Sequence, residues 1–181
     1  PTDVVLFNID SKSDGGSKQN KDAIVNVFLK VFNEMQGYCG AMPFLADLER
    51  RLNEEGRYEE FKQKFEENYG DTWMDSRQDF DFIQDDIVDT LVDMDFMSEA
   101  AARNWCEKAA EPYKISIEDF AKRVKAYIDR KGNNHHVAFL VDEVGQYIGD
   151  DSNLMLNLQT VREELGKECN GKAWVIVTSQ Q

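Results

Sequence analysis

Three short stretches of the chain are apolar at almost every position: Val4–Ile9, Val137–Val141 and Ala173–Val177. A strand with one solvated face alternates apolar and polar residues, so an uninterrupted apolar run indicates a strand buried on both faces. Strands of that kind occur inside parallel sheets. Each run is followed by polar residues, where the strand meets solvent or a ligand. The pattern therefore predicts a three-stranded parallel sheet, with 137–141 as its buried central strand.

Between the first and second runs, apolar residues recur at helical spacing. This spacing predicts an amphipathic helix over 21–36, which Asn20 is placed to cap. Further helices are expected through 37–132, and one more follows the second run. A single helix is predicted from the spacing of five apolar residues: Phe80, Ile83, Ile87, Leu91 and Met94. Residues suited to cap later helices are Ser98, Ser116 and either Asp150 or Asp151.

These elements predict an α/β protein in which a large helical segment interrupts a sheet-containing core. The core is expected to consist of 1–36 and 133–181, and the helical insertion of 37–132. The sequence begins at Pro1, close to one strand, and stops at Gln181, directly after another. We therefore expect the chain to be an excised piece of a longer protein.

The central run leads into two adjacent carboxylates, Asp142 and Glu143. Ligands of open α/β sheets bind outside the carboxyl ends of the strands, so this pair lies where a ligand is expected. Asp142 would hold Mg²⁺ through its water shell, and Glu143 would polarise the water that attacks a γ-phosphate. An apolar strand followed by Asp and Glu is the Walker B pattern. The alternative is that both residues are solvated side chains at a strand end.

The other motif of a nucleotide site, the phosphate-binding loop, is missing from the sequence. The segment 15–18 (Gly-Gly-Ser-Lys) follows the first strand but lacks the Walker A spacing, so we predict a surface loop there. His135 and His136 lie at the opposite end of the central strand. They have no third ligand at metal-site spacing.

Composition narrows the classes of protein further. The 181 residues are 41% apolar and 31% charged, with a formal charge of −14, which argues against direct binding of DNA by this acidic chain. No apolar run approaches the ~18 residues of a membrane span. We interpret the three separated cysteines, Cys39, Cys106 and Cys169, as free thiols in a reducing cytoplasm. The acidic stretch Glu59–Glu99 is either a solvated helix surface or a docking surface for a basic partner.

Three segments together resemble the BrxC family, the P-loop ATPases of bacterial phage-exclusion (BREX) systems. They are Phe139–Gly149, Leu154–Leu165 and Ala173–Gln180, and Phe7–Asp14 adds a weaker similarity. The resemblance implies an additional-strand P-loop core that hydrolyses ATP with Mg²⁺ and works with other proteins of the defence system.

The resemblance also implies roles for particular residues. Asp142 corresponds to the Mg²⁺-associated acid and Glu143 to the catalytic glutamate. Ser179 corresponds to the sensor 1 residue, which orients the attacking water, with Thr178 and Gln180 beside it. The family's Walker A loop would lie upstream of Pro1, so we expect this chain to be inactive by itself.

The sheet of this ATPase class has the strand order 5-1-4-3-2, and the chain would contain strands 2, 3 and 4. The strand Ala173–Val177 would then lack its outer neighbour and form an apolar edge. We predict self-association through this edge, or its protection by a helix or by the end of the chain.

Two other functions are compatible with the sequence. The chain is a non-enzymatic interaction module if the acidic helical insertion is its working surface and the Asp-Glu pair is incidental. It is a receiver-like or phosphatase-like Mg²⁺ domain if Asp10, just past the first strand, joins Asp142 in one site.

Overall fold

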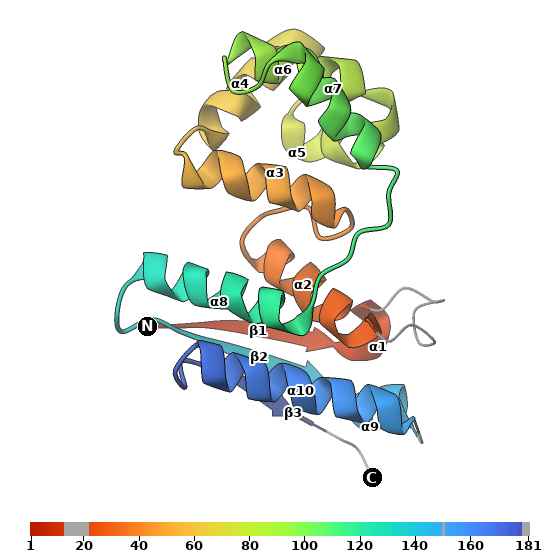
Figure 1. Ribbon diagram of the computed structural model, residues 1–181, viewed down its shortest axis with the longest axis vertical. Helices are drawn as coiled ribbons and strands as arrows, with labels where there is room; N and C mark the ends of the chain where they lie inside the picture. Colours follow the sequence, from red (N-terminus) through yellow and green to blue (C-terminus); the bar gives the residue numbers. More distant parts are fainter. Residues whose placement is uncertain (13–21, 150, 179–181) are drawn as a thin grey trace. The chain divides into compact units, whose positions relative to one another are not determined.

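The computed structural model describes residues 1–12, 22–149 and 151–178. The protein is mixed α/β and mostly helical, and the chain divides into two compact units (Figure 1). The sheet unit comprises 1–40 and 114–181, and the helical unit comprises 41–113. The insertion expected from the sequence, 37–132, is longer than this helical unit. It included one helix too many, because the last helix resembles the others in its spacing of apolar residues. That helix, α8 (Ile117–Lys131), packs on the sheet.

The sheet unit contains a three-stranded parallel sheet, as predicted. The strands follow one another across the sheet in chain order, and residues of the central strand pair with residues of both neighbours: Phe139 is opposite Val5 and Val175. The strands are β1 (Thr2–Asn8), β2 (His136–Asp142) and β3 (Ala173–Val177).

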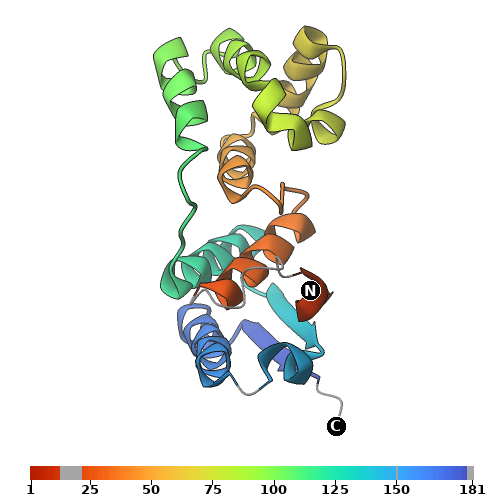
Figure 2. The same ribbon diagram turned by 90° about the vertical axis from the view of Figure 1, so that its right-hand side faces the viewer.

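The helices of the sheet unit gather on one face of the sheet (Figure 2). Both connections between strands step in the same direction across the sheet, and right-handed connections of that kind place their helices on the same side. The helices of these two connections that belong to the sheet unit are three long ones and two short ones: α1 (Ile9–Lys12), α2 (Ala23–Met35), α8, α9 (Val144–Ile148) and α10 (Ser152–Glu168).

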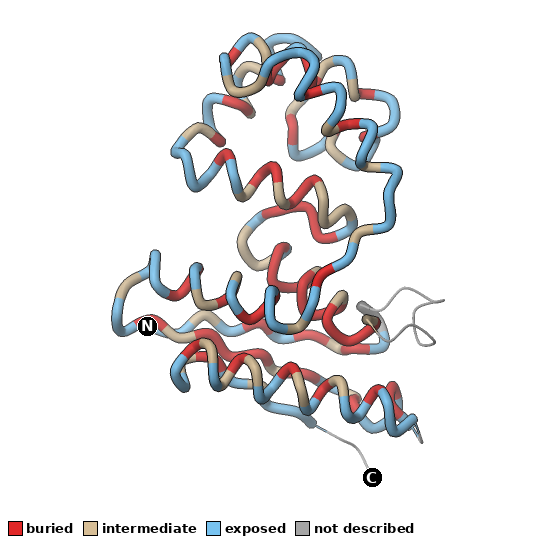
Figure 3. Tube along the Cα trace, in the orientation of Figure 1, coloured by how far each residue is buried: buried red, intermediate tan, exposed pale blue. Residues whose placement is uncertain are grey.

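Aromatic rings fill the space between the sheet and its helices, where the buried positions lie (Figure 3). Phe28 of α2 lies 5.2 Å from Phe139 and 5.5 Å from Phe7 between ring centroids. Phe120 of α8 lies 6.1 Å from Phe139. These phenylalanines are at most 4% exposed, so they form the centre of the core of the sheet unit.

The second face of the sheet carries apolar side chains that remain exposed. Val4 is 55% exposed, Leu6 74%, Trp174 44% and Ile176 49%. The uninterrupted apolar runs predicted strands buried on both faces, and this prediction is wrong for β1 and β3. In β2, Ala138 is 6% exposed and Leu140 is half-buried, because both lie between two neighbouring strands.

The helical unit has its own aromatic core. The indole of Trp73, 1% exposed, lies 4.9 Å from Phe61 and 5.1 Å from Phe65 between ring centroids. The unit is built from six helical segments: α3 (Pro43–Glu54), α4 (Tyr58–Tyr69), α5 (Trp73–Ser76), the 3₁₀ helix η2 (Arg77–Phe82), α6 (Gln84–Asp93) and α7 (Glu99–Lys108).

One predicted helix of this unit is wrong. The five apolar residues that define this spacing are buried as it requires, but the backbone changes from a 3₁₀ helix to α6 at Ile83. Phe80 and Ile83 are three residues apart, a separation that faces the same side in a 3₁₀ helix and in an α-helix alike. The apolar spacing therefore predicted the buried side but not the break.

The predicted helix caps are present where the structure describes them. The side chains of Ser98, Ser116 and Asp151 accept hydrogen bonds from backbone amides of the first helical turn, at 2.9–3.3 Å. Asn20 lies outside the described residues. No described helix is both long and apolar enough to cross a bilayer.

Candidate functional site

The carboxyl ends of the three strands bring polar side chains from distant parts of the chain together. Asn8 at the end of β1 is in register with Asp142 at the end of β2. Thr178 directly follows β3, and its amide donates a hydrogen bond of 2.9 Å to the Val141 carbonyl. This backbone bond continues the pairing of β2 and β3 by one residue, and it holds Thr178 beside Asp142.

Asp142 is the centre of this group. Its Oδ1 accepts a hydrogen bond from the Thr178 hydroxyl and another, of 2.9 Å, from the amide of Glu143. Both bonds end on the same carboxylate oxygen, and the residue is exposed. The carboxylate is therefore oriented by its own chain and by the neighbouring strand while it still faces solvent.

Glu143 has an unusual backbone conformation, with φ 58° and ψ 30°. A residue with a side chain adopts this left-handed region at a cost of about 1–2 kcal/mol. The conformation turns the chain sharply from β2 into α9, where the Val144 amide donates a hydrogen bond of 3.3 Å to the Thr178 carbonyl. Strain of this kind concentrates where a side chain must be presented in a fixed direction.

The Glu143 carboxylate is directed back towards β1, where the amide of Asn8 donates a hydrogen bond to Oε2. Sequence reasoning did not include Asn8 among the site residues. Its signal was a polar residue after four consecutive apolar ones, in a strand parallel to β2. Asn8 also accepts a bond of 3.0 Å from the Asp10 amide.

The remaining predicted residues are distributed as follows. Asp142, Glu143 and Thr178 lie together, whereas Ser179, Gln180 and the segment 15–18 lie outside the described residues. Asp10 belongs to α1, two residues beyond the end of β1, and the residue opposite Asp142 is the uncharged Asn8. The acid that a receiver-like site would pair with Asp142 would therefore come from the segment after β1, and not from its last residue.

The electrostatics of this strand edge favour a cation. Among the described residues, no ion pair with Lys, Arg or His involves Asp142 or Glu143. The described residues also contain no group of three or more His, Cys, Asp or Glu side chains suited to hold a metal by themselves. Mg²⁺ in nucleotide sites takes one or two carboxylates, phosphate oxygens and water, so Asp142 fits a metal that arrives with its nucleotide.

The chain matches no family model and no solved structure. The fold and the strand-end geometry therefore carry the functional argument.

A second polar group lies at the amino ends of the strands. His135 Nε2 lies 2.7 Å from Asp3 Oδ2, which also accepts a hydrogen bond from the Tyr127 hydroxyl. Burial raises the pKa of Asp3, but these hydrogen bonds and the charges of His135 and Lys131 outweigh it and hold the pKa below its ordinary value of 3.8. The group joins β1 to α8 and to the start of β2, so its role is structural.

Asp3→Asn is expected to lower the free energy of unfolding by about 1 kcal/mol at pH 7, because the carboxylate is about one-third exposed. A lowered pKa gives stability that is complete above the ordinary pKa and is lost as pH falls through the folded-state value. The difference between wild type and variant should therefore shrink below about pH 4. Urea unfolding from pH 7 to pH 3 measures it, with Asp119→Asn as the exposed control. A difference that stays constant with pH would contradict this role of Asp3.

Proposed function

We propose that this chain contributes the Walker B and sensor 1 side of a Mg·ATP site in an additional-strand P-loop ATPase. The observation that carries the proposal is the hydrogen bond between Asp142 and Thr178 across neighbouring parallel strands, with Glu143 next to it in the chain. Phosphoryl transfer to water needs a metal-associated acid, a residue that orients the water, and a polar group near the γ-phosphate, all within one small region.

In this proposal each described residue has one task. Asp142 holds the water shell of the Mg²⁺ ion, which neutralises phosphate charge when it is bound. Glu143 accepts the proton of the water whose oxygen bonds to the γ-phosphorus as the bond to ADP breaks. Asn8 is a positioning residue, because its amide fixes Oε2 of Glu143. Thr178 orients Asp142, and Ser179 and Gln180 remain the candidates for contact with the γ-phosphate.

The arrangement of the strands supports the same class. The order β1-β2-β3 corresponds to strands 2, 3 and 4 of the order 5-1-4-3-2. In that order, the strand that precedes the Walker A loop lies next to β3. Its connection to β1 crosses the sheet in the direction opposite to the connections from β1 to β2 and from β2 to β3. A right-handed crossover therefore places the helix of that connection on the face that α2, α8 and α10 do not cover. The open edge of β3 and the exposed face with Leu6 and Trp174 are the surfaces that this strand and helix would cover.

The resemblance to phage-exclusion ATPases adds the biological setting to the proposal. ATP turnover would serve an anti-phage defence system, with the other proteins of that system as partners. Self-association through the exposed apolar strand Ala173–Val177 stays a prediction for the chain when no such segment covers it.

The proposal is tested by supplying the missing loop. The chain alone should bind Mg·ATP weakly or not at all, because the backbone amides and the lysine of a Walker A loop provide most of the phosphate affinity. The same chain extended at its amino end by a Walker A strand, loop and helix should bind and hydrolyse Mg·ATP. Calorimetric titration and phosphate release measure the two steps. Tight binding by the chain alone, or no hydrolysis by the extended protein, would contradict the proposal.

A further inference from the structure

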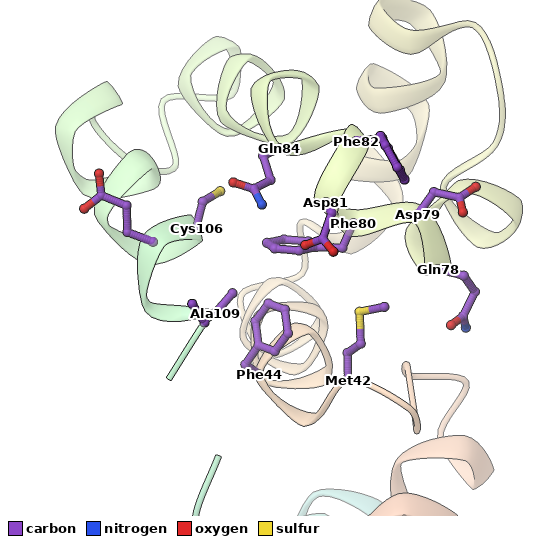
Figure 4. Close-up of a pocket in the computed structure, with 12 residues that line it drawn as sticks. Met42, Phe44, Gln78, Asp79, Phe80, Asp81, Phe82, Gln84, Cys106 and Ala109 are labelled. Carbon is purple, nitrogen blue, oxygen red and sulfur yellow. The ribbon is translucent and has the colours of Figure 1, made fainter. Parts of the chain in front are cut away.

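The helical unit contains a pocket of about 440 Å³ that is separate from the strand-end site (Figure 4). Its walls come from the start of α3, from η2 and from the end of α7. The rings of Phe44 and Phe80 pack edge to face in the pocket, with centroids 4.9 Å apart, and Met42 and Ala109 lie on either side of Phe44. The interior of the pocket is therefore mostly apolar.

The apolar interior extends to Cys106, which is 6% exposed. Burial raises the pKa of the Cys106 thiol to about 11, so this wall is uncharged at neutral pH. The indole ring of Trp105 contacts both phenylalanines, with its centroid 5.7 Å from that of Phe44 and 5.9 Å from that of Phe80. Three aromatic rings in mutual contact give the pocket a rigid base, which favours binding of a side chain without rearrangement.

Phe82 is the second unusual feature of the pocket. It lies in the same short 3₁₀ helix as Phe80, yet Phe82 is 88% exposed whereas Phe80 is 4% exposed. Burying a phenylalanine side chain is favourable, and the fold leaves this gain unused. Single exposed apolar residues are common, but an exposed aromatic ring beside an apolar pocket is typical of a binding surface.

The rim of the pocket is acidic. Asp79, Asp81 and Glu107 line it, and none of the ion pairs among the described residues involves them. By contrast, the carboxylate of Asp85 in α6 forms an ion pair of 3.0 Å with the guanidinium of Arg103. The helical unit contains 20 acidic and 8 basic residues, a formal charge of −12 out of −14 for the chain. Its negative potential therefore coincides with an apolar pocket whose own carboxylates are not neutralised.

We propose that this pocket is a docking site for a basic, amphipathic segment of a partner protein. An apolar side chain of the segment would enter the pocket against Phe44 and Phe80, and the segment would cover Phe82. Lysine or arginine residues beside that anchor would face Asp79, Asp81 and Glu107. The acidic charge selects a basic partner and accelerates its approach, and the apolar anchor supplies most of the affinity.

The test uses a labelled synthetic peptide of about 15 residues with leucine on one helical face and lysine on the other. Fluorescence anisotropy should show binding to the whole chain, and Phe82→Ser should weaken it by about tenfold or more. A peptide with serine in place of leucine and one with glutamate in place of lysine should bind far more weakly. Thermal unfolding of each variant checks that it is folded.

A pair of charge reversals separates docking at the pocket from general attraction to an acidic protein. Asp79→Lys with Asp81→Lys should weaken binding of the leucine–lysine peptide by about tenfold at low salt. Glu66→Lys with Glu67→Lys changes the net charge equally, at exposed positions of α4 that do not line the pocket, and should have little effect. Equal losses in the two double variants would overturn the proposal. So would binding that is insensitive to Phe82→Ser, equal binding of the serine peptide, or no binding to the wild-type chain.

Discussion

Glu143→Gln is expected to reduce ATP hydrolysis by about 10²–10⁴-fold in a protein that joins this chain to a Walker A loop. The glutamine has the shape of glutamate and still accepts a hydrogen bond from Asn8, so the turn after β2 and the nucleotide site should keep their geometry. The amide cannot accept the proton of the attacking water. The loss should therefore appear in kcat, whereas the affinity for Mg·ATP should change little.

The matched control is Glu163→Gln. Glu163 is an exposed residue of α10 whose carboxylate lies 3.5 Å from Arg162, so the same chemical change there should leave hydrolysis intact. Phosphate release under saturating Mg·ATP gives kcat, and nucleotide titration gives the affinity. Undiminished hydrolysis by the Glu143 variant would show that the Asp-Glu pair is incidental. The pocket of the helical unit would then be the better guide to function.

The sheet and the polar edge at its strand ends could be predicted because both depend on local pattern. Uninterrupted apolar runs locate parallel strands, and the polar residues that follow them must meet at one edge once the strands are parallel. This reasoning brought Asp142 and Thr178 together from positions 36 residues apart in the chain. Asn8 was missed because its importance lies in its register with Asp142, and register depends on pairing rather than on composition.

The exposed face of the sheet could not be predicted from the same runs. Val4 and Leu6 have the composition of buried residues, and only the order of the strands determines which face receives helices. Nor did the pattern single out Phe82, which lies two residues after Phe80 in the 3₁₀ helix and faces solvent. Periodicity identifies an apolar side of an element, but it does not say whether that side is covered within the same chain.

Glu49 is the residue of the helical unit that sequence reasoning could least anticipate. It is surrounded in sequence by charged and apolar neighbours, as on a solvated helix, yet its side chain is 0% exposed. Its Oε1 accepts hydrogen bonds from the Tyr58 hydroxyl at 2.8 Å, the Trp73 indole at 2.9 Å and Arg77 at 2.6 Å. Burial and the adjacent carboxylate raise the pKa of Tyr58, so the tyrosine remains a donor.

Glu49→Ala is therefore expected to lower the free energy of unfolding by about 3–5 kcal/mol. The substitution leaves the charge of Arg77, whose side chain is 12% exposed, without this carboxylate, and it removes the acceptor of two buried donors. Glu49→Gln keeps an acceptor oxygen but loses the charge, so its cost should be smaller, about 1–3 kcal/mol. The free energy of unfolding should therefore increase from Glu49→Ala to Glu49→Gln to wild type. The difference between Glu49→Gln and wild type reports the contribution of the charge, and the difference between the two variants reports that of the hydrogen bonds.

Urea unfolding followed by tryptophan fluorescence measures these differences, because Trp73 lies against Glu49 in the same unit. Glu55→Ala is the control. The ion pair of Glu55 with Arg51 has exposed side chains, 47% and 57%, and should contribute less than about 1 kcal/mol. Equal effects of Glu49→Ala and Glu55→Ala would mean that the buried carboxylate is no better paired than a surface one. A large loss confined to Glu49 would show that one buried acid joins α3, α4, α5 and η2, the elements that also hold Phe44 and Phe80 in place.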